Sequence, residues 1–172
     1  MLLIGCAKAP APATARRGTA GVTLAAPPAA DDSAAMMAWF ERAAAAIDAD
    51  TSRYTRHALP LVLGAGATGA ITAWRDGAIW ARMRVETRGD GFQASDDFWL
   101  RNGVLLGARL IARRPGRATA VEQVWFRDLH LYRWSDASGD HLNPTARSTQ
   151  HEVQRLRTRA DSLLRRLDRT SP

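Results

Sequence analysis

Residues 70–86 read AITAWRDGAIWARMRVE, a run rich in Ile, Thr, Trp and Val that an Asp-Gly pair interrupts. Asp-Gly between alternating apolar residues is a strong signal for a β-hairpin. We therefore expect the chain to reverse direction at Asp76-Gly77, with one strand on either side of the turn.

The segment before this hairpin carries glycines at the spacing of a dinucleotide-binding loop. LPLVLGAGATGA, residues 59–70, contains G-x-G-x-x-G at Gly64, Gly66 and Gly69, and Glu86 stands about where a ribose-binding carboxylate would be expected. The motif needs a helix after the glycines, because the helix N-terminus approaches the pyrophosphate. The Asp76-Gly77 turn leaves no room for one. We therefore predict a flexible Gly/Ala loop before a sheet and no NAD or FAD binding, which disfavours a nucleotide-dependent enzyme.

The hairpin belongs to a repeat with a period of 26 residues. Its copies read WRDGAIW at 74–80, LRNGVLL at 100–106 and FRDLHLY at 126–132. Further turn signals fall between the copies, at Asp90-Gly91 and Pro115-Gly116, so each unit supplies two strands. The repeat predicts a six-stranded antiparallel β-meander over 69–135.

Two-residue loops at the turns decide which side chains share a face of this sheet. One face is the predicted core and includes Ala81, Met83, Phe98, Leu100, Val124 and Phe126. At its edge we expect a charge cluster in which Arg109 stands opposite both Asp96 and Glu122, each pair contributing about 0.2–1 kcal/mol. Arg109→Leu should then destabilise more than Asp96→Asn.

The opposite face is predicted to combine aromatic and arginine side chains, namely Trp80, Arg82, Trp99, Arg101, Trp125, Arg127 and Tyr132. This composition is typical of binding hot spots, so the face is the candidate binding surface. The alternative is a sheet buried on both sides, with one terminal helix over each face.

Amphipathic helices are predicted at both ends of the folded part. Asp and Ser N-caps precede a helix over 33–48, in which helical spacing relates Met36, Trp39, Phe40, Ala43 and Ile47. A second helix over 150–168 carries the stripe Val153, Leu156, Ala160, Leu163, Leu164 and Leu167. With the sheet, these helices form a single α+β domain over 31–172.

The N-terminus resembles that of a bacterial lipoprotein. Leu3-Ile4-Gly5-Cys6 is similar to the lipobox, in which the signal peptide is cut before a cysteine that then carries a diacylglyceryl group. Only five residues precede Cys6, without a basic n-region or a full apolar h-region. We therefore expect the true start to lie upstream, with 1–5 a remnant of the signal peptide. Cys6 is the single cysteine and can form no internal disulfide.

Residues 6–30 are rich in Ala, Pro, Thr and Gly without periodicity, which is typical of a disordered tether. The lipoprotein resemblance implies a lipid anchor, and Ala7 rather than Asp after the cysteine implies the outer membrane, with the domain facing the periplasm. The repeats also loosely resemble bacterial envelope and antitoxin-like proteins built on aromatic-x-Asp/Asn-Gly-x-Leu, over roughly 70–135. That resemblance implies a β-meander that binds or supports something and carries over no active site.

The sequence contains no motif for catalysis or metal binding. None of the four histidines, His57, His130, His141 and His151, has a second ligand at metal spacing, and no G-x-S-x-G elbow occurs. We therefore predict a non-catalytic envelope protein without cofactor or metal. Its partners would be the membrane, through the lipid anchor, and a second envelope protein.

The charge leaves one alternative open. A formal net charge of +7 and a pI of about 11.0 suit nucleic acid, and aromatics among arginines could form a stacking platform. Lys8 is the only lysine, a bias that with abundant Ala indicates GC-rich coding. Export would keep the protein away from RNA. Acylation of Cys6 therefore separates an envelope protein from a soluble nucleic-acid-binding protein.

Overall fold

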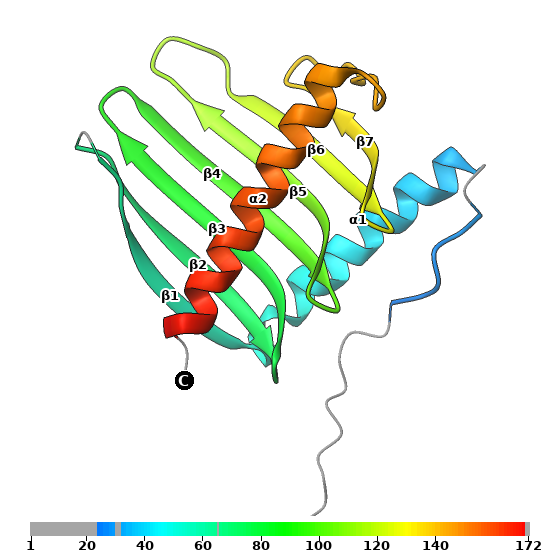
Figure 1. The fold of residues 1–172 in the computed structure, drawn as a ribbon, viewed down its shortest axis with the longest axis horizontal. Coiled ribbons are helices and arrows are strands. Elements are labelled where there is room, and N and C mark those ends of the chain that lie inside the picture. The colour runs from blue at the N-terminus through cyan, green and yellow to red at the C-terminus, as the bar shows by residue number, and fades with distance from the viewer. Residues whose placement is uncertain (1–23, 30–31, 65, 171–172) are drawn as a thin grey trace, which may run out of the picture.

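The computed structural model describes residues 24–29, 32–64 and 66–170. The lipobox with Cys6, and most of the expected tether, lie outside the described residues. Helix α1 spans Ser33–Ala49, the 3₁₀ turn η1 Asp50–Arg53 and helix α2 Arg147–Thr170 (Figure 1). Between them lie β1 Thr55–Val62, β2 Thr68–Asp76, β3 Ile79–Gly89, β4 Phe92–Arg101, β5 Val104–Arg113, β6 Ala120–Arg127 and β7 His130–Ser135.

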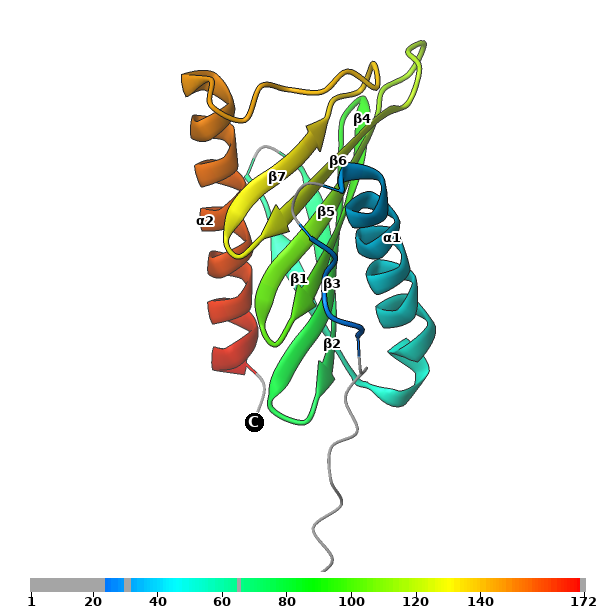
Figure 2. The same ribbon diagram turned by 90° about the vertical axis from the view of Figure 1, so that its right-hand side faces the viewer.

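The strands form one antiparallel sheet in the order of the sequence, from β1 to β7. Helix α1 lies against one face and α2 against the other, so the molecule has three layers (Figure 2). The predicted α+β meander between two helices is confirmed. It has seven strands, whereas the repeat predicted six.

The additional strand is β1, which includes part of the glycine-rich stretch. Leu59 to Val62 pair with β2, so the sheet begins before the predicted Gly/Ala loop. Gly69 lies within β2, where a Cβ atom would stand only 2.6 Å from the carbonyl oxygen of Glu86. Because β2 follows the glycines, the predicted absence of a helix there is confirmed. The motif therefore belongs to a β-hairpin.

Helix α1 begins where its sequence suggests, and both helices bury their apolar stripes. Asp32 caps α1, its Oδ1 accepting a hydrogen bond of 2.8 Å from the N–H of Ala35. The predicted stripe of α1 is buried, and α2 buries Val153, Leu156, Ala160 and Leu167. The helices extend slightly beyond their expected limits, to 33–49 and 147–170.

The first hairpin turns one residue later than predicted. Asp76 pairs with Ile79, so the loop consists of Gly77 and Ala78 instead of Asp76 and Gly77. Gly77 has φ 57, and glycine at the first loop position is typical of a type II′ turn. The later turn at Asp90-Gly91 falls where the sequence places it.

Each repeat contains a register shift near its turn. Trp74 pairs with Arg82 but Arg75 pairs with Trp80, so the ladder passes over Ala81. It passes over Leu106 and Tyr132 in the same way in the next two copies. An extra residue in one strand inverts the alternation of side chains beyond it. The β3–β4 pair, which has no such shift, keeps its predicted partners.

Apolar clusters fill both sides of the sheet. The cluster under α2 contains most of the predicted core, including Met83, Phe98, Leu100, Val124 and Phe126. The cluster under α1 contains Ala81, Trp99, Leu106 and Trp125, so Ala81 lies on the face opposite to the predicted one. The sheet is therefore covered on both sides, as in the alternative considered from the sequence.

Candidate functional site on the α1 face of the sheet

The tryptophans of the predicted binding surface are core residues. Trp99 and Trp125 are each 2% exposed and stack on one another at 5.7 Å between ring centroids, and Phe40 of α1 stacks on Trp125. Trp80 is buried on the other face, where its Nε1 donates to Asp168 of α2 over 2.8 Å. The prediction of an exposed aromatic surface was wrong for these three residues. The apolar stripe of α1 needs an apolar sheet face to pack against, and Trp99 and Trp125 provide it.

Three other members of the predicted set, Arg101, Arg127 and Tyr132, remain nearer to solvent. Arg101 is half-buried, with its guanidinium 5.3 Å from the ring centroid of Trp39. Tyr132 is also half-buried, and its ring centroid lies 5.3 Å from that of Phe40. Arg127 is half-buried, whereas Arg82 is buried and belongs to an ion-pair network. Helix α1 thus divides the predicted surface into a covered part and an open part.

A partly buried ion-pair network joins α1 to the sheet. Asp97, which is 3% exposed, accepts hydrogen bonds from Arg82 Nη2 at 2.9 Å and from Arg84 Nε at 2.8 Å. Asp48 of α1 pairs with Arg82 Nε at 3.0 Å and accepts a hydrogen bond of 2.8 Å from Trp99 Nε1. The hydrogen bond to Asp97 raises the pKa of Arg84. Sequence reasoning missed Asp97 as an ion-pair partner, although the predicted β3–β4 register already placed it opposite Arg84.

Arg109 does not join the predicted charge cluster. It pairs in register with Asp97 and Gln123, and its guanidinium lies 5.6 Å from the ring centroid of Trp99, on the α1 side. Asp96 and Glu122 instead both stand opposite Leu110. The register shift at Leu106 turns Arg109 to the other face, so the predicted stability difference between Arg109→Leu and Asp96→Asn loses its structural basis.

Asp96 is instead paired with an arginine of α2. Arg159 Nη2 lies 2.5 Å from Asp96 Oδ2, and Glu122 accepts a hydrogen bond of 2.9 Å from Trp134 Nε1. Burial raises the pKa of Asp96, and Arg159 opposes this rise. A carboxylate with a raised folded-state pKa binds more protons when folded. Its contribution to the free energy of unfolding therefore falls as pH rises from the ordinary aspartate pKa, about 3.9, toward the raised pKa of the folded state.

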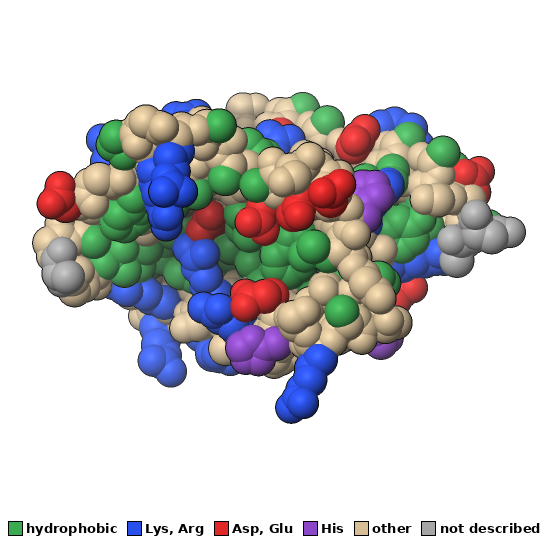
Figure 3. Space-filling model, turned by 90° about the horizontal axis from the view of Figure 1, so that it is seen from above, with side chains coloured by type: hydrophobic (Ala, Val, Ile, Leu, Met, Phe, Trp, Pro, Cys, Tyr) green, Lys and Arg blue, Asp and Glu red, His purple; other side chains and the backbone are tan. Residues whose placement is uncertain are grey.

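The open part of the α1 face forms a hollow lined by arginines over β3, β4 and β5. It has a volume of about 310 Å³, and its lining includes Arg84, Arg88, Arg109 and Arg113 together with Glu86 and Asp97. We call it the arginine-lined hollow. Seen from the end of the sheet with the β3–β4 and β5–β6 turns, basic and acidic side chains are interspersed around hydrophobic ones (Figure 3).

The arginine-lined hollow carries a net positive charge, with four arginines and two carboxylates in its lining. Asp97 is engaged by Arg82 and Arg84, and Glu86 faces the same hollow. Within the part of the chain that the structure describes, Arg88, Arg109 and Arg113 have no carboxylate within ion-pair distance. The hollow can therefore accept an anionic group.

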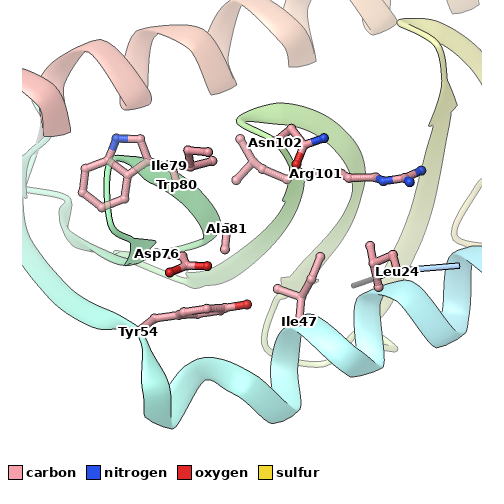
Figure 4. A pocket seen from close by; sticks show the side chains of 10 residues that line it. Leu24, Ile47, Tyr54, Asp76, Ile79, Trp80, Ala81, Arg101 and Asn102 are labelled. Atoms are coloured by element: carbon pink, nitrogen blue, oxygen red, sulfur yellow. The ribbon is translucent and has the colours of Figure 1, made fainter. Parts of the chain in front are cut away.

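A smaller cavity lies at the other end of the strands, between α1 and the β2–β3 and β4–β5 turns (Figure 4). Its volume is about 230 Å³, with Ile47, Ile79 and Leu100 among its apolar lining. Tyr54 and Asp76 lie next to each other, whereas Arg101 extends away from them (Figure 4). Burial, with Asp50 and Asp76, raises the pKa of Tyr54.

A search for metal sites and membrane-spanning helices, and comparisons with other proteins, add no functional assignment. The described residues contain no group of three or more His, Cys, Asp or Glu side chains that could hold a metal ion. Among these residues there is also no helix with the length and apolar character needed to cross a membrane. Comparisons of the chain with protein-family models, with curated proteins and with solved structures find no match.

Proposed function

We propose that this protein is a non-catalytic, lipid-anchored component of the bacterial cell envelope that binds an acidic partner protein. The lipobox-like Leu3-Ile4-Gly5-Cys6 and the Ala/Pro-rich segment after it support the anchor. The observation that carries the binding role is the arginine-lined hollow, with three arginines that lack carboxylate partners among the described residues. The domain would face the periplasm from the outer membrane.

The hollow has the chemistry of a protein interface. Arginine is enriched in such interfaces, because its planar guanidinium forms paired hydrogen bonds with carboxylates. Arg109 is partly held in place by its contact with the Trp99 ring, which lowers the conformational entropy lost on binding. Arg88 and Arg113 are exposed and can meet a partner directly. Complementary charge would give specificity and fast association.

The covered tryptophans favour this function over nucleic-acid binding. Proteins that bind single-stranded nucleic acid stack bases on exposed aromatic rings. Trp99 and Trp125 are packed under α1 and offer no such platform. The arginines of the hollow remain, and they suit carboxylates as well as phosphates.

Site-specific photo-crosslinking in the native cell tests the binding role. A photoreactive residue at Gln93, which lines the hollow and is exposed, should yield an adduct with a distinct envelope protein. Asp161, exposed on α2, provides the control position. Arg88→Glu with Arg113→Glu should lower the yield at Gln93 by roughly tenfold or more, because like charges oppose each other across the interface.

A charge-matched variant separates this site from a general effect of net charge. Arg165→Glu with Arg169→Glu makes the same change on exposed positions of α2 and should leave the Gln93 adduct intact. Equal adducts at Gln93 and Asp161, or equal losses in the two double variants, would exclude the hollow as the binding surface.

The anchor predicts the chemistry of the mature N-terminus. Mass spectrometry of protein from its native cell should find a chain that begins at Cys6 with lipid on the thiol. An intact Met1 together with a free thiol would exclude the anchor and return nucleic-acid binding to consideration.

A further inference from the structure

An apolar cavity opens at the opposite end of the strands from the arginine-lined hollow. It lies between α1 and the β4–β5 and β6–β7 turns and has a volume of about 330 Å³. Its walls include Trp39 and Phe40 of α1, Leu106 of β5 and Phe126 of β6. This volume is at the lower end of the range for small-molecule sites, which are mostly apolar with a few polar groups.

Two arginines place positive charge in this apolar lining. Arg101 and Arg127 both line the cavity, with Asp128 as the only acidic residue in the lining. Arg127 Nη1 is buried and has no hydrogen-bond partner among the described residues. Its Nε lies 3.6 Å from Asp128 Oδ2, but the Asp128 side chain is 85% exposed and remains hydrated. A buried donor without an acceptor is unfavourable. The Arg127 side chain as a whole is 28% exposed and lines the cavity, so its positive charge favours an anionic ligand there.

The rim of the cavity keeps apolar side chains in solvent. Val104 is 46% exposed and Leu129 is 52% exposed. Leu129 occupies a left-handed conformation, φ 68, at the loop position that Gly103 fills in the preceding hairpin with φ 76. Bulky residues rarely adopt this conformation. The rim therefore extends the apolar surface at a position where glycine would fit the backbone better.

We propose that this cavity binds a small amphipathic carboxylate, a molecule with one anionic head and an apolar chain. The carboxylate accepts hydrogen bonds from the Arg127 guanidinium, and the chain packs against Phe40, Leu106 and Phe126. One net positive charge in the lining matches a single negative charge on the ligand. The site does not depend on the arginine-lined hollow, which serves the proposed envelope function.

Isothermal titration of the purified full-length chain with decanoate, below its micellar concentration, tests this site. Decanoate should bind saturably with one site per chain. The uncharged 1-decanol should bind at least about tenfold more weakly, since it cannot form the charged hydrogen bonds, and acetate, which lacks the chain, should not bind measurably. Equal affinity for decanoate and decanol would overturn the role of Arg127.

Two variants and one control locate the binding. Arg127→Gln should weaken decanoate binding by about tenfold or more, and Val104→Glu should do the same by placing a carboxylate at the half-exposed rim. Arg75→Gln is the control. Arg75 has the same position in the sequence repeat and also a buried nitrogen without a partner among described residues, but it contacts Trp80 of the core under α2. No saturable binding, or equal weakening by Arg75→Gln and Arg127→Gln, would refute the proposal.

Discussion

Trp99→Ala should lower the free energy of unfolding by about 3–5 kcal/mol, measured by chemical denaturation of the purified chain. Trp99 is 2% exposed and contacts both Trp125 of the sheet and Asp48 of α1. Alanine would leave a cavity beneath α1 and remove the indole hydrogen bond to the Asp48 carboxylate. Trp125→Ala, which removes the ring that stacks on Phe40, should have an effect of similar size.

Two further variants identify the source of this loss. Trp99→Phe keeps an aromatic ring and removes the hydrogen bond to Asp48, so it should cost less than Trp99→Ala. Trp74 is half-buried, with Arg82 above its ring, and Trp74→Ala should also cost less than Trp99→Ala. If Trp99→Ala and Trp74→Ala cost the same small amount, Trp99 would not be part of a packed core.

This result would also decide the role of the aromatic face. Aromatic and arginine side chains on one sheet face are equally compatible with a binding surface and with a core that has arginines at its margin. In the structure, α1 covers Trp99 and Trp125 and leaves the arginines of the hollow outside, two from β3 and two from β5. The binding surface that we propose is therefore next to the tryptophans and does not include them.

Most of the turns and the two helices could be predicted from sequence because their signals are local. The exceptions are the first hairpin, which turns one residue later, and Pro115-Gly116, which lies in a longer loop between β5 and β6. Asp90-Gly91 and Asn102-Gly103 form the predicted two-residue loops, and Asp32 caps α1. Strand β1 was missed because the glycines after it favour a loop, although its apolar residues pair with β2 over its full length. A glycine is needed at position 69 of β2 because there is no room for a Cβ atom, and not because the backbone there requires flexibility.

The site was harder to predict because it depends on which face of the sheet each side chain occupies, and this alternation must be followed over many residues. A shift of one residue at Leu106 was enough to turn Arg109 away from Asp96. No feature of the sequence marks Ala81, Leu106 or Tyr132 as the residues that the ladder passes over. The ion pair of Asp96 with Arg159 was equally out of reach, because it depends on where α2 crosses the sheet.

Asp97→Ala should also lower the free energy of unfolding by about 3–5 kcal/mol, because it leaves the buried guanidinium of Arg82 with only one carboxylate partner. Asp97 is 3% exposed and Arg82 is 8% exposed, so water can replace little of the lost interaction. Asp97→Asn removes the charge at nearly constant volume, so it should lower the free energy of unfolding by most of the amount expected for Asp97→Ala. Ser95→Ala, on the same face of β4 two residues earlier and half-buried, should stay within about 0.5 kcal/mol.

The direction of the stability change produced by a second substitution tests whether unpaired charge causes the loss in Asp97→Ala. In the Asp97→Ala background, Arg82→Met removes the incompletely paired buried cation and should recover part of the lost stability. If the loss came from a cavity alone, Arg82→Met would add a further loss, because it also removes the contact of the Arg82 guanidinium with the Trp74 ring. Recovery would show that Asp97 neutralises buried charge at the boundary between the tryptophan core and the arginine-lined hollow. A further loss would assign Asp97 a packing role, with Asp48 sufficient to compensate Arg82.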